Sequence, residues 1–145
     1  MTNDHLERSS LNRQVGFHLR QATSAVWADL VETLAPFRLK PQDYATLQIV
    51  EASPGCKQQD IANALRIQRP NMVPLIDRLV TQGLIFRQVN PVDRRSNALA
   101  LTKAGRAMTA RAGEAHRLHE ARVAAALAGN DAKAVLDALR KLAQL

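Results

Sequence analysis

The sequence predicts a mainly α-helical fold with one small β-hairpin, which places it in the α+β class. Three observations support this prediction. The chain has 145 residues, the size of one domain. Its apolar residues recur at helical spacing over most of its length. One pair of short apolar runs, separated by a charged turn, has the pattern of two paired strands.

The first predicted helix is long. Its apolar residues recur at nearly heptad spacing from Leu6 to Leu34, and Pro36 ends it. Such a helix exposes more apolar surface than one small core can cover, which predicts packing against a partner. A second helix opens at Lys40-Pro41, since a proline N–H is not needed at the first helical position. The segment 53–55, Ser-Pro-Gly, ends it.

Two shorter helices follow with a tight connection between them. The pattern predicts a helix over Gln58–Leu65, a connection over Arg66–Arg69, and a further helix that runs to about Gln82. Gly83 suits the C-cap of that helix. Its apolar residues form one clean stripe: Met72, Leu75, Ile76, Leu79 and Val80.

A hairpin and two more helices complete the chain. Leu84–Val89 and Ala98–Leu101 read as strands around the charged turn 90–96. Thr102 suits the N-cap of an alanine-rich helix over Lys103–Leu127. A break at 129–131 precedes an amphipathic helix that runs from Asp131 to Leu142.

The order of these elements predicts a winged helix. A short helix, a tight turn and an amphipathic helix form a helix-turn-helix, and the hairpin after it forms the wing. The net charge of the chain is +7, and the segment Lys57–Arg106 carries nine of the 20 basic residues but only three of the 13 acidic ones. The basic excess therefore lies on the helix-turn-helix and its wing, which favours a nucleic-acid partner.

Composition excludes several other classes. A single cysteine allows no intrachain disulfide and no zinc finger. No apolar run has the length of a membrane span, and the start MTNDHLERSS is not a signal peptide, so we expect a cytoplasmic protein without a membrane partner. Neither a glycine-rich phosphate loop nor a supported catalytic constellation is present, which predicts a protein that is not an enzyme and needs no cofactor.

The fourth predicted helix carries the candidate base-reading residues. Pro70 and Pro74 lie on its outward side, Asn71 lies at the edge of that side, and Arg69 directly precedes the helix. The N-terminal part of this outward face is the part of such a helix that meets base edges in the major groove. Arg pairs well with guanine, Asn with adenine, and proline offers only apolar contact, for example with a thymine methyl. Because Pro74 conflicts with a regular helix around it, we expect Asn71 to be the N-cap or the first turn to be loosened.

Other residues are candidates for contact with the DNA backbone, which sets affinity and register rather than sequence choice. They are Lys57, Gln58 and Gln59 at the start of the third helix, and Arg78 and Thr81 on the fourth. At the wing, Arg94 and Arg95 can reach a phosphate or the minor groove, while Asp93 is expected to hold the tip by pairing with an arginine.

The segment 54–106 resembles the MarR family of bacterial transcriptional regulators. The matching pieces are Gln58-Gln59-Asp60-Ile61-Ala62, Leu75-Ile76-Asp77-Arg78-Leu79, Gly83-Leu84-Ile85, Pro91-Val92-Asp93-Arg94-Arg95 and Leu101-Thr102-Lys103-Ala104-Gly105-Arg106. The resemblance implies one domain over 1–145, with dimerisation helices in 1–36 and 107–145 and a DNA-binding region in 40–106. It implies that Asp93-Arg94-Arg95 is the family's wing motif, whereas Pro74 departs from the family's common pattern.

The resemblance also implies the partners and the regulation. We expect a homodimeric repressor that binds a pseudo-palindromic operator on double-stranded DNA and releases it when a small aromatic or phenolic ligand binds. His18, Trp27 and Tyr44 are the candidate residues of the ligand pocket.

Two alternatives remain open from the residues. One is a winged-helix adaptor that binds proteins rather than DNA. The other is a redox-sensing regulator that uses Cys56, although a small buried hydrophobic role fits this cysteine better. The pair His116 and His119, with Glu120 beside it, is expected on a solvated helix face rather than in a metal site.

Overall fold

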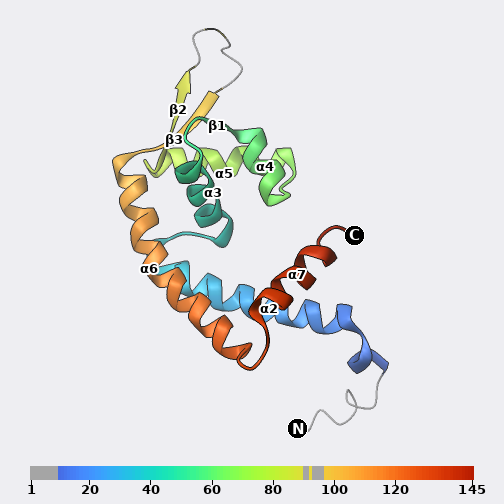
Figure 1. The fold of residues 1–145 in the computed structure, drawn as a ribbon. Coiled ribbons are helices and arrows are strands. Elements are labelled where there is room, and N and C mark those ends of the chain that lie inside the picture. Colours follow the sequence, from blue (N-terminus) through green and yellow to red (C-terminus); the bar gives the residue numbers. More distant parts are fainter. Residues whose placement is uncertain (1–9, 90–91, 93–96) are drawn as a thin grey trace. The chain divides into compact units, whose positions relative to one another are not determined.

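The computed structural model describes residues 10–89, 92 and 97–145 (Figure 1). The described residues confirm the mainly α-helical fold with a small antiparallel sheet. The elements are η1 Ser10–Arg13, α2 Val15–Leu34, η2 Ala35–Phe37, α3 Pro41–Ala52, β1 Cys56–Lys57, α4 Gln58–Leu65, α5 Arg69–Thr81, β2 Ile85–Val89, β3 Asn97–Leu101, α6 Lys103–Ala126 and α7 Ala132–Leu142.

The chain forms two compact units. One consists of Val31–His116, and the other joins the described part of Met1–Leu30 to Arg117–Leu145. Each unit is described below by itself, and α2 and α6 each contribute to both. None of the described helices has the combination of length and apolar character that crossing a membrane requires.

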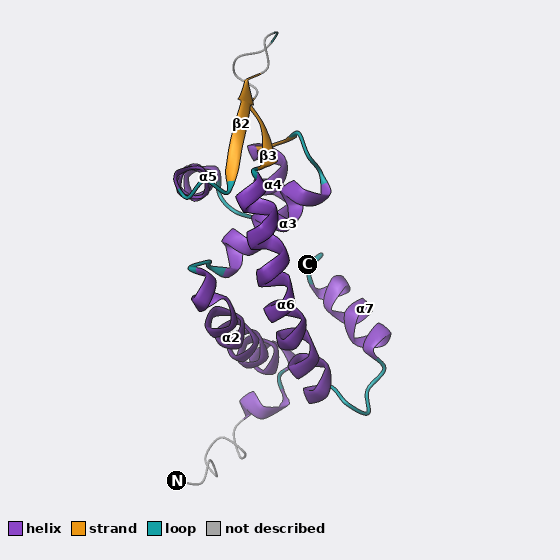
Figure 2. Cartoon of the chain, turned by 90° about the vertical axis from the view of Figure 1, so that its left-hand side faces the viewer, coloured by secondary structure: helices purple, strands orange, loops and turns teal. Residues whose placement is uncertain are grey.

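The unit Val31–His116 holds the winged helix. Its sheet has the strand order β1-β3-β2, and β2 and β3 pair from Ile85↔Leu101 to Val89↔Asn97 (Figure 2). The two-residue strand β1 pairs with β3 through Cys56↔Leu99, and the sequence pattern did not predict it. Helices α3, α4 and α5 contact one another and the sheet around a shared apolar core. Its completely covered side chains include Leu47, Ile61, Met72, Ile76 and Leu79.

The start of α6 is fastened to the end of the helix-turn-helix. The Thr102 hydroxyl accepts a hydrogen bond from the Gly105 N–H at 2.9 Å, which confirms the predicted N-cap. The same hydroxyl donates to the Gly83 carbonyl at 2.6 Å. A Cβ on Gly105 would lie 2.0 Å from the Leu84 carbonyl oxygen, so this close approach of two backbones requires glycine.

The other unit lacks an apolar interior. Within its described residues, the only buried side chain is His119, which is 2% exposed. Val15 is 70% exposed, Leu118 65% and Leu136 51%. The first helix also begins later than the pattern predicts, since η1 and a break at Gln14 precede α2. The predicted start at Leu6 lies outside the described residues.

Candidate nucleic-acid interface

The connection between α4 and α5 is three residues long and has helix-turn-helix geometry. Helix α4 covers Gln58–Leu65, the range that the sequence predicts. Arg66 follows in the left-handed region with φ 53°, and the Ile67 N–H reaches back to the Ala62 carbonyl at 2.9 Å. This pattern closes a helix C-terminus and turns the chain sharply. It thereby aims the first turn of α5 away from the core.

One of the two expectations for the start of α5, that Asn71 is its N-cap, was wrong. The helix begins at Arg69, with Gln68 as its N-cap, so Asn71 is the third helical residue and not the cap. The Gln68 carbonyl accepts hydrogen bonds from the N–H groups of Asn71, at 2.9 Å, and Met72, at 3.2 Å. Pro70 favours this earlier start because its fixed φ suits the first turn. Pro74 therefore lies inside the helix, where it removes one backbone donor.

The candidate base-reading residues are all exposed at the start of α5. The 3.6-residue period puts Pro70 and Pro74 on the face opposite the buried stripe and Asn71 at the edge of that face. Arg69 lies in line with the stripe and is exposed because it is the first residue of the helix. The side chains that could reach a base edge are therefore accessible.

Arg69 is held in place by α4. Its Nε donates to the Gln59 side-chain oxygen, and the Gln59 amide nitrogen donates to Asn63 Oδ1 at 2.7 Å. A chain of three polar side chains thus links the two helices on the exposed surface. Gln59, a predicted backbone-contact residue, orients Arg69 in this arrangement.

Two other residues predicted to contact the DNA backbone lie at the N-terminus of α4. Lys57 lies in β1 and is the N-cap of α4, and Gln58 is the first helical residue. The Lys57 N–H donates to Asp60 Oδ2 at 2.9 Å, so a carboxylate already occupies this helix end. A phosphate here would depend on the side chains of Lys57 and Gln58 more than on free backbone N–H groups.

Arg78 has a structural partner that the sequence pattern did not predict. Its guanidinium donates to the Asp43 carboxylate of α3, which is 1% exposed. The other carboxylate oxygen accepts the Lys40 N–H at 2.8 Å. Arg78 therefore ties α5 to α3. Thr81, the other predicted backbone-contact residue on this helix, is exposed in its last turn.

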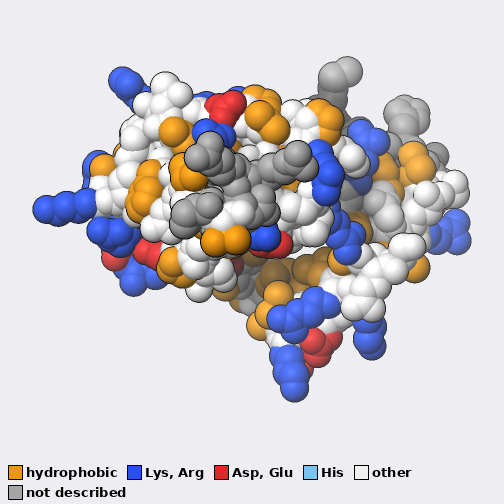
Figure 3. Space-filling view, turned by 90° about the horizontal axis from the view of Figure 1, so that it is seen from above, with side chains coloured by type: hydrophobic (Ala, Val, Ile, Leu, Met, Phe, Trp, Pro, Cys, Tyr) orange, Lys and Arg blue, Asp and Glu red, His pale blue; other side chains and the backbone are white. Residues whose placement is uncertain are grey.

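The wing is the loop that joins β2 and β3. Arg87 in β2 pairs with Asp77 of α5 at 2.5 Å, which joins the hairpin to the helix. The predicted wing residues Asp93, Arg94 and Arg95 lie outside the described residues. On the face shown in Figure 3, which looks down on this end of the chain, Lys and Arg side chains are more frequent than Asp and Glu.

Neither the cysteine nor the histidine pair forms a reactive or metal site in the described residues. Burial, with help from Asp60, raises the pKa of the half-buried Cys56 thiol, the opposite of what a redox sensor needs. His116 packs against the Tyr44 ring with centroids 5.1 Å apart. The expectation that His119 faces solvent was wrong, because its Nδ1 lies 2.5 Å from the Asp29 carboxylate. The described residues contain no group of three side chains that could together hold a metal ion.

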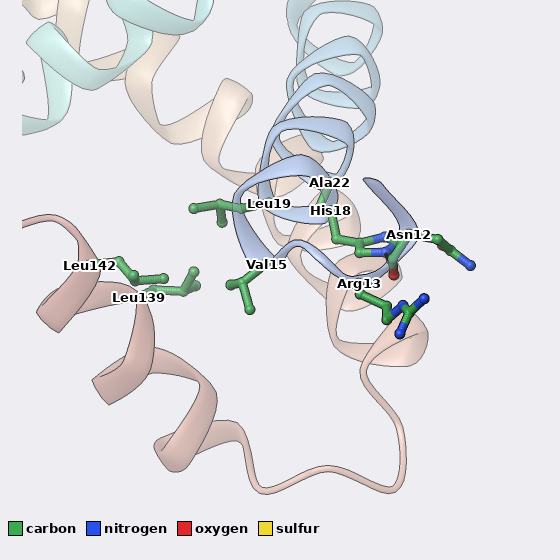
Figure 4. A pocket seen from close by; sticks show the side chains of 8 residues that line it. All are labelled: Asn12, Arg13, Val15, His18, Leu19, Ala22, Leu139 and Leu142. Atoms are coloured by element: carbon green, nitrogen blue, oxygen red, sulfur yellow. Dashed lines mark hydrogen bonds between the residues drawn. The ribbon is translucent and has the colours of Figure 1, made fainter. Parts of the chain in front are cut away.

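A cavity of about 410 Å³ lies in the unit that contains the chain ends (Figure 4). Its lining is mostly apolar: Val15, Leu19 and Ala22 come from α2, and Leu139 and Leu142 of α7 face them. Asn12, Arg13 and His18 complete the lining, and His18 Nε2 lies 2.8 Å from the Asn12 carbonyl. Of the predicted ligand residues, the cavity contains His18 alone. Trp27 is 48% exposed, and Tyr44 is buried in the winged-helix unit.

The comparison with known proteins agrees with this geometry. The model of the MarR family matches residues 39–96. A solved structure of the transcriptional repressor CouR bound to a 23-mer DNA duplex is 37% identical, with a TM-score of 0.88, and the alignment covers 93% of this chain and 96% of that chain. The chain belongs to the MarR family.

Further relatives have related descriptions. CouR bound to p-coumaroyl-CoA is 34% identical, with a TM-score of 0.83, over 93% of this chain and 95% of that one. A protein of Thauera aromatica, assigned as the transcriptional regulator of the hcr operon, is 32% identical over 101 residues. That alignment covers 69% of this chain and 61% of the relative, so the chain spans less than two thirds of its length.

Family membership accounts for the separate pieces of the interface. In this MarR family chain, the matched range 39–96 contains α3, α4, α5 and β2, together with the segment that joins β2 to β3. These are the elements that carry Arg69, Gln59 and Arg78. The C-terminal helices lie beyond the range that the family model matches, and they carry most of the exposed leucines.

Proposed function

We propose that the chain is a homodimeric transcriptional repressor that binds double-stranded DNA in a sequence-specific way and leaves it when an aromatic effector binds. The observation that carries this proposal is the 37% identity, over 93% of the chain, to a repressor bound to a DNA duplex. The proposal makes the chain a regulator rather than an enzyme, and it places the protein in the cytoplasm, where bacterial DNA is.

The proposed division of labour on DNA follows from exposure and charge. Arg69 and Asn71 read base edges from the exposed start of α5. Lys57 and Gln58, with Arg94 and Arg95 of the wing, contact the backbone and supply the electrostatic part of the affinity. Arg78 acts mainly by holding α5 against α3, because a buried carboxylate already binds its guanidinium.

The proposed dimer is supported by the unit that lacks an apolar interior. Its exposed leucines and valines lie on all three of its helices, α2, α6 and α7, and exposed apolar side chains in number favour a contact surface. A second copy of the chain would cover them. A two-fold dimer would also present two copies of α5 to half-sites about one helical turn apart, roughly 10–10.5 base pairs.

The effector class is supported by the CouR structure that is bound to p-coumaroyl-CoA. We propose an aromatic acyl thioester of coenzyme A, which combines a phenolic or aromatic ring with an anionic tail. The net charge of +7 suits such a ligand. Of the three expected ligand residues, we propose His18 for the effector, because it lines the cavity at the start of α2.

Fluorescence anisotropy with purified protein tests the proposal. Labelled duplexes should include the region upstream of the gene itself and a random sequence, each over a range of salt concentrations. Binding should favour one duplex, and its affinity should fall steeply with salt. Arg94→Ala should weaken binding to all duplexes by a similar factor and flatten the salt dependence. Asn71→Ala should cost about tenfold on the preferred duplex alone.

The effector is tested in the same assay by adding p-coumaroyl-CoA, with coenzyme A and p-coumarate as separate controls. Release of DNA by the thioester, but not by either part, is the expected result. Lack of salt-dependent binding to any duplex would exclude the repressor and favour an adaptor for proteins. If Arg94→Ala changed only the sequence preference, the assignment of the wing to the DNA backbone would be wrong.

A further inference from the structure

The solvent-facing side of α5 carries an apolar patch where a helix surface is usually polar. Val73 is 47% exposed, and Pro70 and Pro74 beside it are exposed too. These residues stand three and four positions apart, so they share one face of the helix. We name Pro70, Val73 and Pro74 the outer patch.

The outer patch is not a misplaced part of the core. The core of this unit already takes four residues of α5, namely Met72, Leu75, Ile76 and Leu79, each at most 3% exposed. The stripe and the outer patch therefore lie on different faces. Exposed apolar side chains that cluster in this way generally mark a contact surface.

The chemistry of the outer patch restricts what it can recognise. Two of its three residues are prolines, which have no N–H, and a valine side chain has no polar atom. The patch can therefore neither donate nor accept a hydrogen bond through its side chains. It can contact only another apolar group, and the two proline rings hold it rigid.

The surroundings of the outer patch favour DNA as the occupant. Arg69 directly precedes Pro70 in the sequence and is bound to Gln59 of α4, and Asn71 directly follows Pro70. The segment from Lys57 to Arg106 has nine basic and three acidic residues. A small apolar surface inside a cationic one is complementary to the major groove, in which thymine alone presents a methyl group among phosphates.

We infer that Val73, with Pro70 and Pro74, contacts the 5-methyl groups of thymines in each half-site, and that Val73 is a specificity-determining residue. This inference rests on the proposed DNA-binding function. It assigns hydrogen-bonded readout to Arg69 and Asn71 and methyl readout to the outer patch. The preferred half-site then contains at least one thymine opposite the first two turns of α5.

Replacement of thymine by deoxyuridine tests the inference directly, since it removes the methyl group and nothing else. A high-affinity duplex is first selected from a random pool with the wild-type protein. Each thymine is then replaced in turn, and the dissociation constant is measured by anisotropy. At one or two positions in each half-site, the affinity should fall about three- to tenfold, the size expected for one buried methyl group.

Protein variants then identify the residue. Val73→Ala should bind the thymine duplex several-fold more weakly than wild type and should lose its sensitivity to deoxyuridine at the critical position. Val73→Thr keeps the shape of the side chain but places a hydroxyl against the methyl group, so it should weaken binding as well. Val31→Ala is the matched control: it makes the same substitution in α2, where Val31 is 42% exposed. This variant should keep full sensitivity to deoxyuridine.

The outcomes separate this inference from the function on which it rests. If wild type binds the selected duplex but no deoxyuridine changes the affinity, methyl readout is wrong and DNA binding stands. If Val73→Ala leaves DNA affinity unchanged, the outer patch serves another partner, such as a protein, and the inference again fails. If wild type binds no duplex in a salt-dependent way, the proposed function itself fails.

Discussion

The ion pair with Asp43 gives Arg78, one of the residues predicted to contact the DNA backbone, a structural role in the fold. The two residues are 35 positions apart in the chain and form one ion pair between α3 and α5. Spacing on a helix predicts that Arg78 faces outward, and its side chain is indeed 36% exposed. Nothing in the sequence around Arg78 indicates that its guanidinium binds a buried carboxylate of another helix.

A double-mutant cycle between these residues measures the pair. Asp43→Asn and Arg78→Ala should each lower the free energy of unfolding by about 1–3 kcal/mol, because each leaves its partner or the Lys40 N–H poorly satisfied. The double variant should lose clearly less than the combined single losses. Chemical denaturation is the measurement. If the losses of the two single variants simply added, the two side chains would not be coupled, and Arg78 would be available to contact a DNA phosphate.

Asp29 should make the stability of the unit that contains both chain ends depend on pH. The Arg122 guanidinium, and after it His119, lower the pKa of the Asp29 carboxyl below its usual range. Two of the contacts are Arg122 Nη2 to Oδ2 at 2.7 Å and His119 Nδ1 to the same oxygen at 2.5 Å. A carboxylate whose pKa is lowered by folding stabilises the protein above its unfolded pKa, and this contribution disappears as pH falls through the folded value.

Asp29→Asn should therefore be less stable than wild type at neutral pH, and the difference should shrink once the pH falls below about 4, the ordinary carboxyl pKa. Arg122→Gln should reduce the same acid-sensitive part of the stability. Thermal denaturation of the three proteins between pH 7 and pH 2.5 tests this. A difference that stays constant over the whole range would show that ionisation of Asp29 is not its source.

At the scale of elements, the sequence predicts most helices well and their ends less well. Helix α4 has the predicted bounds because Asp60, its third residue, caps the start through the Lys57 N–H, and the chain turns at Arg66 directly after Leu65. The predicted N-cap of α5, Asn71, lies three residues after the observed one, Gln68, because Pro70 and Pro74 give conflicting signals and only Pro70 decides the cap. Strand β1 escaped prediction because two residues carry no periodicity.

The candidate interface was predictable to the extent that it depends on helix period. The exposure of Pro70 and Pro74 follows from the buried stripe on the other side of α5, whereas Arg69 is exposed because it is the first residue of the helix. The link from Arg69 to Gln59 joins two elements and depends on the angle of the turn at Arg66, which no local pattern specifies. Contacts of that kind require the fold itself.

At the scale of the whole molecule, the apolar side chains are distributed unevenly between the two units. The buried apolar side chains of the described residues all lie between Leu34 and Ala112, within the winged-helix unit. The unit that contains most of α2, the end of α6 and α7 has few buried side chains in its described residues. A second copy of the chain supplies the missing cover in the dimer that we propose.

Leu139→Glu tests this at the exposed face of α7, where Leu139 is 44% exposed. A carboxylate in an apolar interface should weaken the dimer by about 30-fold or more. Lys141→Glu is the control. It places a glutamate on a different face of α7 from Leu139 and should leave the dimer intact. Sedimentation velocity over a range of concentrations distinguishes the two. Equal behaviour of both variants would remove α7 from the interface.

The uneven core has a consequence for a cell that makes two versions of this protein. In the dimer that we propose, each chain needs another copy to complete one of its units, so copies with intact and damaged DNA-binding surfaces would pair freely. A chain altered only at Arg69 or Arg94 would then draw normal chains into mixed pairs that hold a single half-site. Such a mutant would be genetically dominant over the normal gene, whereas a chain altered at Leu139 would be recessive.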